Sequence, residues 1–215
     1  MIVNQIQQQI EDFYRIPSGI HIEDFMLTIE ALKKIYPSLD NKEPVPKELT
    51  LISFENNTHY IGLFVDPLVL RCLEEKNPMR QLDKSNFENF LTVVEGVSHF
   101  VYLYQRALIR RPATELELEI QAEVDKYLLC LLYLNQKNRP LKTWGLLKKL
   151  FHSYHLKPQL TPEQMQRYQL AHRLGYRFCR HLAGQCRHWH HLSQRMKKIR
   201  DFFHSGLTGK LHALA

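Results

Sequence analysis

Apolar residues recur every three or four positions through most of this chain, the spacing typical of helices that bury one face. In residues 23–36, for example, the apolar positions include Phe25, Ile29 and Leu32. The same pattern predicts helices over residues 4–15, 23–36, 67–75, 86–109, 115–136, 141–153, 162–183 and 187–204. Gly206 and Gly209 predict a loosened tail after the last helix.

One segment departs from helical spacing. Residues 49–54 and 59–65 are short runs rich in β-branched and aromatic residues, and Glu55, Asn56 and Asn57 lie between them. Asparagine tolerates the backbone conformations of a tight turn, so residues 49–65 predict a β-hairpin, which needs helices to pack on. The expected fold class is therefore mainly α, with about eight helices around a single core and one β-hairpin near residues 49–65.

Three segments carry the residue pattern of a helix N-terminus. Two are capping boxes, at Ser85–Glu88 and Thr114–Glu117, and the third, Thr161–Gln164, places a proline at the first helical position. Helix breaks are expected at Pro112 and Pro140, each of which follows basic residues.

Length and composition bound the organisation of the chain. Its 215 residues, 44% hydrophobic and 24% charged, are typical of a globular protein large enough to bury a core without disulfides or metal. We therefore expect a single domain over residues 1–215. Eight glycines and four cysteines exclude collagen-like chains and disulfide scaffolds.

We expect a cytoplasmic protein. The first residues lack the basic and apolar regions of a secretory signal. The longest apolar run, residues 127–134, is shorter than the roughly 20 residues that a membrane span needs. No pair of cysteines has CxxC spacing, so we expect buried thiols in a reducing compartment.

Charge divides the chain into two parts. Residues 1–125 carry 20 acidic and 12 basic side chains, a net charge of −8, whereas residues 126–215 carry 17 basic and two acidic ones, a net charge of +15. Nine of the twelve histidines also lie in the second part. Such asymmetry indicates an anionic partner, or a basic part that packs against the acidic part of the same chain.

The basic part is amphipathic. Ala171, Leu174, Phe178 and Leu182 share one apolar helical face, and basic residues lie opposite them and along the following helix. The candidate anion-binding residues are Arg173, Arg177, Arg180, Arg187, Arg195 and Lys198. Such a ridge neutralises phosphates or an acidic protein surface. The sequence lacks the pattern of a helix-turn-helix, RNA-recognition or zinc-finger module.

A second group of polar residues lies on the apolar helix at 86–109. Thr92, Glu95, His99, Tyr102 and Arg106 fall within roughly 80° of one another around the helix axis. On the next helix, Glu115, Glu119, Glu123 and Lys126 share a face. If the two helices form an antiparallel hairpin with both stripes inward, His99 lies beside Glu123.

Several roles are open for these stripes. Glu95, His99 and Glu123 are candidates for general acid–base chemistry, and Glu95, His99, Glu119 and Glu123 for a divalent metal. The stripe could also bind a ligand through the side chains of Tyr102 and Arg106. The Glu-x-x-x-His spacing differs from the Glu-x-x-His of ferritin-like di-iron helices, and His-Glu-x-x-His is absent. The alternative is that these residues have no catalytic or ligand-binding role and form a solvated stripe or a buried ion-pair network between the two helices.

Motifs of common enzyme classes are missing. The sequence has no GxxxxGK[ST], GxGxxG or GxSxG segment, which removes the usual support for nucleotide hydrolysis, dinucleotide binding and an elbow serine. The leading hypothesis is a non-enzymatic cytoplasmic binding protein whose basic C-terminal helices contact nucleic acid or an acidic protein. The alternative is a helical metal-binding protein or enzyme centred on the Glu/His cluster of residues 86–136.

Overall fold

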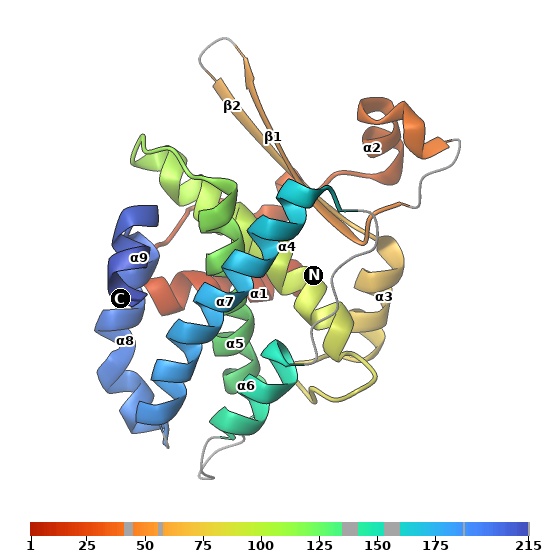
Figure 1. Cartoon of the computed structure of the whole chain (residues 1–215). Helices are drawn as coiled ribbons and strands as arrows, with labels where there is room; N and C mark the ends of the chain where they lie inside the picture. Colours follow the sequence, from red (N-terminus) through yellow and green to blue (C-terminus); the bar gives the residue numbers. More distant parts are fainter. Residues whose placement is uncertain (41–44, 56–57, 135–141, 153–159, 187, 215) are drawn as a thin grey trace. The chain divides into compact units, whose positions relative to one another are not determined.

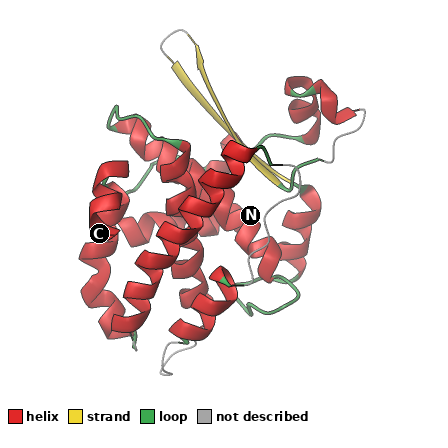
Figure 2. Cartoon of the chain, in the orientation of Figure 1, coloured by secondary structure: helices red, strands yellow, loops and turns green. Residues whose placement is uncertain are grey.

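A computed structural model of the chain describes residues 1–40, 45–55, 58–134, 142–152, 160–186 and 188–214. These residues form nine α-helices and one two-stranded antiparallel sheet (Figure 2), which confirms the mainly α fold with one β-hairpin. None of the helices in these ranges has both the length and the apolar character needed to cross a bilayer.

The elements follow one another along the chain in a simple order. They are α1 (Ile2–Tyr14), α2 (Ile29–Ile35), β1 (Glu48–Glu55), β2 (Thr58–Val65), α3 (Pro67–Glu75), α4 (Phe87–Leu108), α5 (Glu115–Leu134), α6 (Thr143–Phe151), α7 (Pro162–Gln185), α8 (Trp189–His204) and α9 (Leu207–Leu214). Two short 3-10 helices, η1 (Ile22–Phe25) and η2 (Pro37–Asp40), flank α2.

The chain divides into two compact units between Arg111 and Pro112. Unit 1 holds residues 1–12 and 16–111, and unit 2 holds residues 13–15 and 112–215. Unit 1 has 15 acidic and 11 basic residues, a net charge of −4, and unit 2 has 7 acidic and 18 basic residues, a net charge of +11. Each unit keeps the sign of charge expected for its part of the chain, but the boundary differs, because the five carboxylates of residues 112–125 belong to unit 2. That residues 1–215 form a single domain stays a prediction.

In unit 1 the β-hairpin packs on α4 at its base, and its turn end extends away from the helix (Figure 1). The strands pair from Glu48 with Val65 to Glu55 with Thr58, and the predicted turn residues Asn56 and Asn57 lie outside the described residues. Glycine permits the close approach, because a Cβ at Gly96 would lie only 2.7 Å from the Glu48 side chain.

The helix predicted over residues 23–36 is wrong in its first half. Residues 22–25 form η1, and α2 begins only at Ile29. Between them the Leu27 amide donates a hydrogen bond to the Leu63 carbonyl of β2, at 2.8 Å. The backbone there pairs with the hairpin instead of continuing the helix, and Thr28 then caps α2 by accepting a hydrogen bond from the Ala31 amide.

Two of the three predicted helix starts are confirmed. Thr114 and Glu117 exchange capping hydrogen bonds at α5, and Thr161 and Gln164 form a complete capping box at α7. The Ser85–Glu88 box is wrong, because the Ser85 hydroxyl donates to Asp83 instead. Asn86 occupies the N-cap of α4, and its side chain bonds to backbone carbonyls outside the helix.

Unit 2 is built around α5 and α7. These two helices pack along each other, and α6 contacts both (Figure 1). The two helices approach closely at Gly175 of α7, where a Cβ would lie 2.6 Å from the Cβ of Glu123. Any larger residue at position 175 therefore pushes the two helices apart.

We expect Gly175→Ala to lower the free energy of unfolding by about 1–3 kcal/mol, the usual cost of overpacking. Gly184→Ala is the matched control on the same helix, because a Cβ at Gly184 meets nothing within 4 Å. We expect the control to match or slightly exceed the wild-type stability. Urea unfolding with an unchanged m value measures both. Equal stability of the two variants would contradict the close packing of α5 on α7.

The loosened tail predicted from Gly206 and Gly209 is wrong. Residues 207–214 form α9, in which Lys210 is fully buried and Leu214 is buried. The Lys210 ammonium donates to the Gln121 side-chain oxygen at 2.7 Å and to the Phe202 carbonyl at 2.8 Å. Tertiary hydrogen bonds thus stabilise a helix of eight residues, one of them Gly209, which is too short to be stable alone.

Candidate anion-binding site

The basic ridge predicted on the C-terminal helices lies on the surface of unit 2. Arg173, Arg177 and Arg180 of α7 and Arg195 of α8 are exposed, and Lys198 is half-buried. In the described part of the chain, none of these four arginines forms an ion pair with a carboxylate. The sixth candidate, Arg187, lies outside the described residues.

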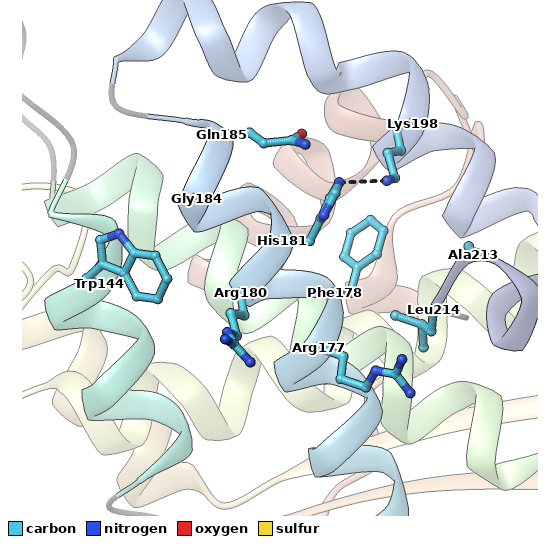
Figure 3. A pocket seen from close by; sticks show the side chains of 10 residues that line it. All are labelled: Trp144, Arg177, Phe178, Arg180, His181, Gly184, Gln185, Lys198, Ala213 and Leu214. Atoms are coloured by element: carbon cyan, nitrogen blue, oxygen red, sulfur yellow. Dashed lines mark hydrogen bonds between the residues drawn. The ribbon is translucent and has the colours of Figure 1, made fainter.

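Part of this ridge borders a pocket of about 650 Å³ in unit 2 (Figure 3). The pocket is lined by Trp144 of α6, Arg177, Phe178, Arg180, His181, Gly184 and Gln185 of α7, Lys198 of α8, and Ala213 and Leu214 of α9. No acidic residue is among the described residues that line it. Three cationic side chains therefore face one cavity without a carboxylate to neutralise them.

The pocket also has an apolar component. Phe178 is buried, and its ring stacks on Phe202 with centroids 4.0 Å apart. Leu214 is buried beside it, whereas the indole of Trp144 is 56% exposed at the opposite border of the pocket (Figure 3). The site thus combines a rigid apolar wall, an accessible aromatic face and positive charge.

Lys198 is held in the pocket by a neighbouring histidine. Its ammonium lies 2.9 Å from the His181 Nε2 (Figure 3), and because the ammonium can only donate, the imidazole must accept. Burial, together with the charges of Lys198 and Arg195, lowers the pKa of His181. The ring is therefore neutral at pH 7, and the positive charge of the pocket comes from Arg177, Arg180 and Lys198.

Other residues of α7 make the contacts that neutralise charge within unit 2. Arg167 forms an ion pair with Glu115 of α5. The His172 Nδ1 lies 3.0 Å from the Glu123 carboxylate, and its Nε2 lies 3.0 Å from the Phe151 carbonyl. Both ring nitrogens face acceptors, so His172 fits this position as an imidazolium. Packing of the basic part against the acidic helix thus accounts for Arg167 and His172, but not for the exposed ridge.

The His172–Glu123 pair predicts a dependence of stability on pH. Burial lowers the pKa of His172, but the Glu123 carboxylate and the Phe151 carbonyl outweigh it, so the pKa is raised above 6.5. Burial likewise raises the pKa of Glu123, but Lys126 and His172 outweigh it and lower the pKa below 4.5. Stabilisation by His172 is complete below pH 6.5 and is lost as the pH rises through the raised pKa. Stabilisation by Glu123 is complete above pH 4.5 and is lost on acidification.

We therefore expect His172→Gln to lower the free energy of unfolding most between about pH 4.5 and 6.5, by about 1.5–3 kcal/mol. The difference from the wild type shrinks above this range. Urea unfolding at a series of pH values measures it, and His212→Gln, at an exposed position of α9, is the control. A difference that grows from pH 6 to pH 9 would contradict the charged state assigned to His172.

The stripe predicted on α4 is largely buried in unit 1. His99 is 7% exposed, and its Nδ1 lies 3.9 Å from the carboxylate of Glu48, a buried residue of β1. Tyr102 and Arg106 are also buried, with the guanidinium 5.9 Å from the ring centre, and Glu95 is half-buried. The sequence pattern was compatible with a buried polar network or with a catalytic site. The burial of these side chains agrees better with the buried network.

The stripe predicted on α5 belongs to unit 2. Glu119 and Glu123 are half-buried, and Lys126 donates to Glu123 at 3.1 Å. Over the described ranges, no three or more His, Cys, Asp or Glu side chains are grouped so as to hold a metal ion. Roles of Glu95, His99, Glu119 and Glu123 in catalysis or divalent-metal binding stay predictions.

Several pocket residues were not predicted as site residues. Trp144 lies at the edge of the apolar face of α6. A tryptophan in such a position is usually a core residue, so the sequence pattern does not mark it as part of a site. His181 and Gln185 follow Arg177 at spacings of four residues, which is the signal in the sequence for one shared helical face. The contributions of Ala213 and Leu214 depend on α9, a helix that the sequence pattern does not predict.

Comparison with known proteins found no matching family model, no matching curated protein and no matching solved structure.

Proposed function

We propose that this chain is a cytoplasmic nucleic-acid-binding protein whose α7 and α8 contact the phosphate backbone. The observation that carries the proposal is the group of exposed arginines on α7, Arg173, Arg177 and Arg180, which have no ion pair among the described residues. Arginine is the side chain that most often binds phosphates bidentately. All four cysteines lack a disulfide, which is in keeping with a reducing compartment.

The surroundings of the arginines favour nucleic acid over an acidic protein. The pocket that Arg177 and Arg180 border also offers the exposed indole of Trp144 and the apolar wall formed by Phe178. An acidic peptide needs only the charges, whereas a nucleic-acid strand uses both cations for its phosphates and an aromatic face for its bases.

Fluorescence anisotropy with labelled DNA and RNA oligonucleotides at low salt tests the proposal. We expect the wild type to bind and the triple variant Arg173→Ala, Arg177→Ala, Arg180→Ala to lose most of the affinity. The matched control replaces Lys84, Lys148 and Lys149, which are exposed, lie outside α7 and α8 and do not line the pocket, by alanine. Equal affinity of the two triple variants, or no binding by the wild type, would overturn the proposal.

Competition separates the two classes of anionic partner. Polyglutamate presents carboxylates without bases, so we expect it to displace a bound oligonucleotide only at much higher charge concentration than unlabelled oligonucleotide does. Equal competition at equal charge would point to an acidic protein partner instead.

A further inference from the structure

We infer that the pocket beside α7 takes one unpaired nucleotide of a bound strand, so that the protein selects single-stranded over double-stranded nucleic acid. This inference rests on the proposed function and specifies how that site is used.

The volume of the pocket sets the size of its occupant. A cavity of about 650 Å³ falls in the range that holds a small organic molecule, and a nucleotide is of that class. A base inside a duplex is stacked and paired, and it reaches such a cavity only after it leaves the stack. A single strand offers its bases without that cost.

The apolar and aromatic residues suit the base. The indole of Trp144 is exposed on the α6 side of the pocket, and buried Phe178 and Leu214 form the facing wall (Figure 3). Stacking on an aromatic side chain stabilises a bound base without selecting its sequence. The Phe178 ring is already stacked on Phe202, so binding of a base costs little side-chain conformational entropy at this wall.

The polar residues suit the phosphate and the base edge. Arg177 comes from α7 and Lys198 from α8, so cations reach the pocket from two helices. Gln185 lines the same pocket, and its side-chain oxygen is buried with no hydrogen-bond partner in the described part of the chain. Turning that amide toward a donor such as an exocyclic amine satisfies an acceptor that is otherwise unpaired.

Gly184 allows a test that spares the fold. A Cβ at this position meets nothing within 4 Å, so the helix accepts a side chain there, and that side chain enters the pocket. We expect Gly184→Glu to abolish binding of a nucleoside monophosphate in titration calorimetry, because it adds bulk and negative charge. Gly184→Ala is the control and should bind within about twofold of the wild type.

Trp144 tests the stacking. Because the side chain is 56% exposed, its replacement should leave the fold intact. We expect Trp144→Ala to weaken binding of a nucleoside monophosphate and of a single strand by about tenfold, and Trp144→Phe to restore most of the affinity. Inorganic phosphate should bind far more weakly than the monophosphate and should not respond to Trp144→Ala.

The outcomes distinguish this inference from the proposed function. Preference for a single strand over the duplex of the same sequence, lost in Gly184→Glu but kept in Gly184→Ala, supports the inference. Equal binding of single strand and duplex, with no effect of Trp144→Ala, overturns it but leaves the arginine-dependent binding of nucleic acid in place. Equal affinity for inorganic phosphate and the monophosphate also overturns it, because the pocket is then a phosphate site. No oligonucleotide binding by the wild type removes the proposed function itself.

Discussion

Reversing the charge of Arg177 and Arg180 together should lower the affinity for single-stranded nucleic acid by about 100-fold at low salt. Both residues line the pocket in unit 2, and neither forms an ion pair among the residues that the structure describes. If the two arginines contact phosphates as proposed, Arg177→Glu and Arg180→Glu remove both contacts and add two repulsive charges, which together cost several kcal/mol. Neither side chain supports the core, so the stability of the protein should change little.

The control for this variant carries the same change in net charge. Lys148→Glu with Lys149→Glu reverses two exposed cations of α6 that do not line the pocket. We expect the control to weaken binding by less than about fivefold, through long-range electrostatics alone. Equal losses in the two double variants would show that net charge, and not the α7 site, determines binding.

Lys210→Met should lower the free energy of unfolding by about 2–4 kcal/mol. The buried ammonium lies 4.3 Å from the centre of the Phe202 ring as well as bonding to Gln121 and to the Phe202 carbonyl. Methionine keeps the apolar stem but removes the donor to the Gln121 oxygen and one of two donors to the Phe202 carbonyl, which also accepts from the Ser205 hydroxyl. Urea unfolding measures the loss, and Lys197→Met, at an exposed site, is the control. A loss below about 0.5 kcal/mol would contradict the role of Lys210 in holding α9.

This lysine belongs to a larger buried network, which makes the prediction more specific. Gln121, which accepts from Lys210, donates to the Tyr14 hydroxyl at 2.8 Å and to Asp125 at 3.0 Å. The Tyr14 hydroxyl in turn donates to Asp125. Because these groups share partners, Tyr14→Phe and Lys210→Met should have non-additive effects in a double-mutant cycle. Additive effects would show that the two ends of the network act independently.

Local features of the fold follow from the sequence. Apolar spacing predicted that Ala171, Leu174, Phe178 and Leu182 are buried on α7 and left the arginines opposite them on the surface, as the structure has them. The Thr161 capping box depends only on residues within one turn, so it too was predictable. The mainly α fold and the hairpin rest on the same kind of short-range pattern.

Features that depend on distant partners were not predictable in this way. Lys210 bonds to a residue 89 positions away, and His172 to one 49 positions away. Without the first contact, Gly206 and Gly209 argue against a helix, which is why α9 was not predicted. Helical spacing pairs His99 with residues of the next helix, whereas in unit 1 its Nδ1 lies 3.9 Å from the carboxylate of Glu48, at the start of a strand.

The pocket contains some residues that local sequence predicts and others that depend on the packing of distant helices. The sequence identified Arg177, Arg180 and Lys198 as candidates, because basic residues recur along amphipathic helices. It did not identify the cavity, whose walls come from four helices and include Trp144 and Leu214. An arrangement of this kind depends on how helices pack, and helical periodicity carries no information about that.

The salt dependence of oligonucleotide binding tests most directly whether the exposed arginines of α7 contact phosphates. Each phosphate contact with a single strand contributes about 0.7 to the slope of the logarithm of the binding constant against the logarithm of the salt concentration. We predict that binding by the wild type weakens steeply with salt, and that the slope becomes shallower by about 2 in the triple variant Arg173→Ala, Arg177→Ala, Arg180→Ala. The same slope in both proteins would contradict the account.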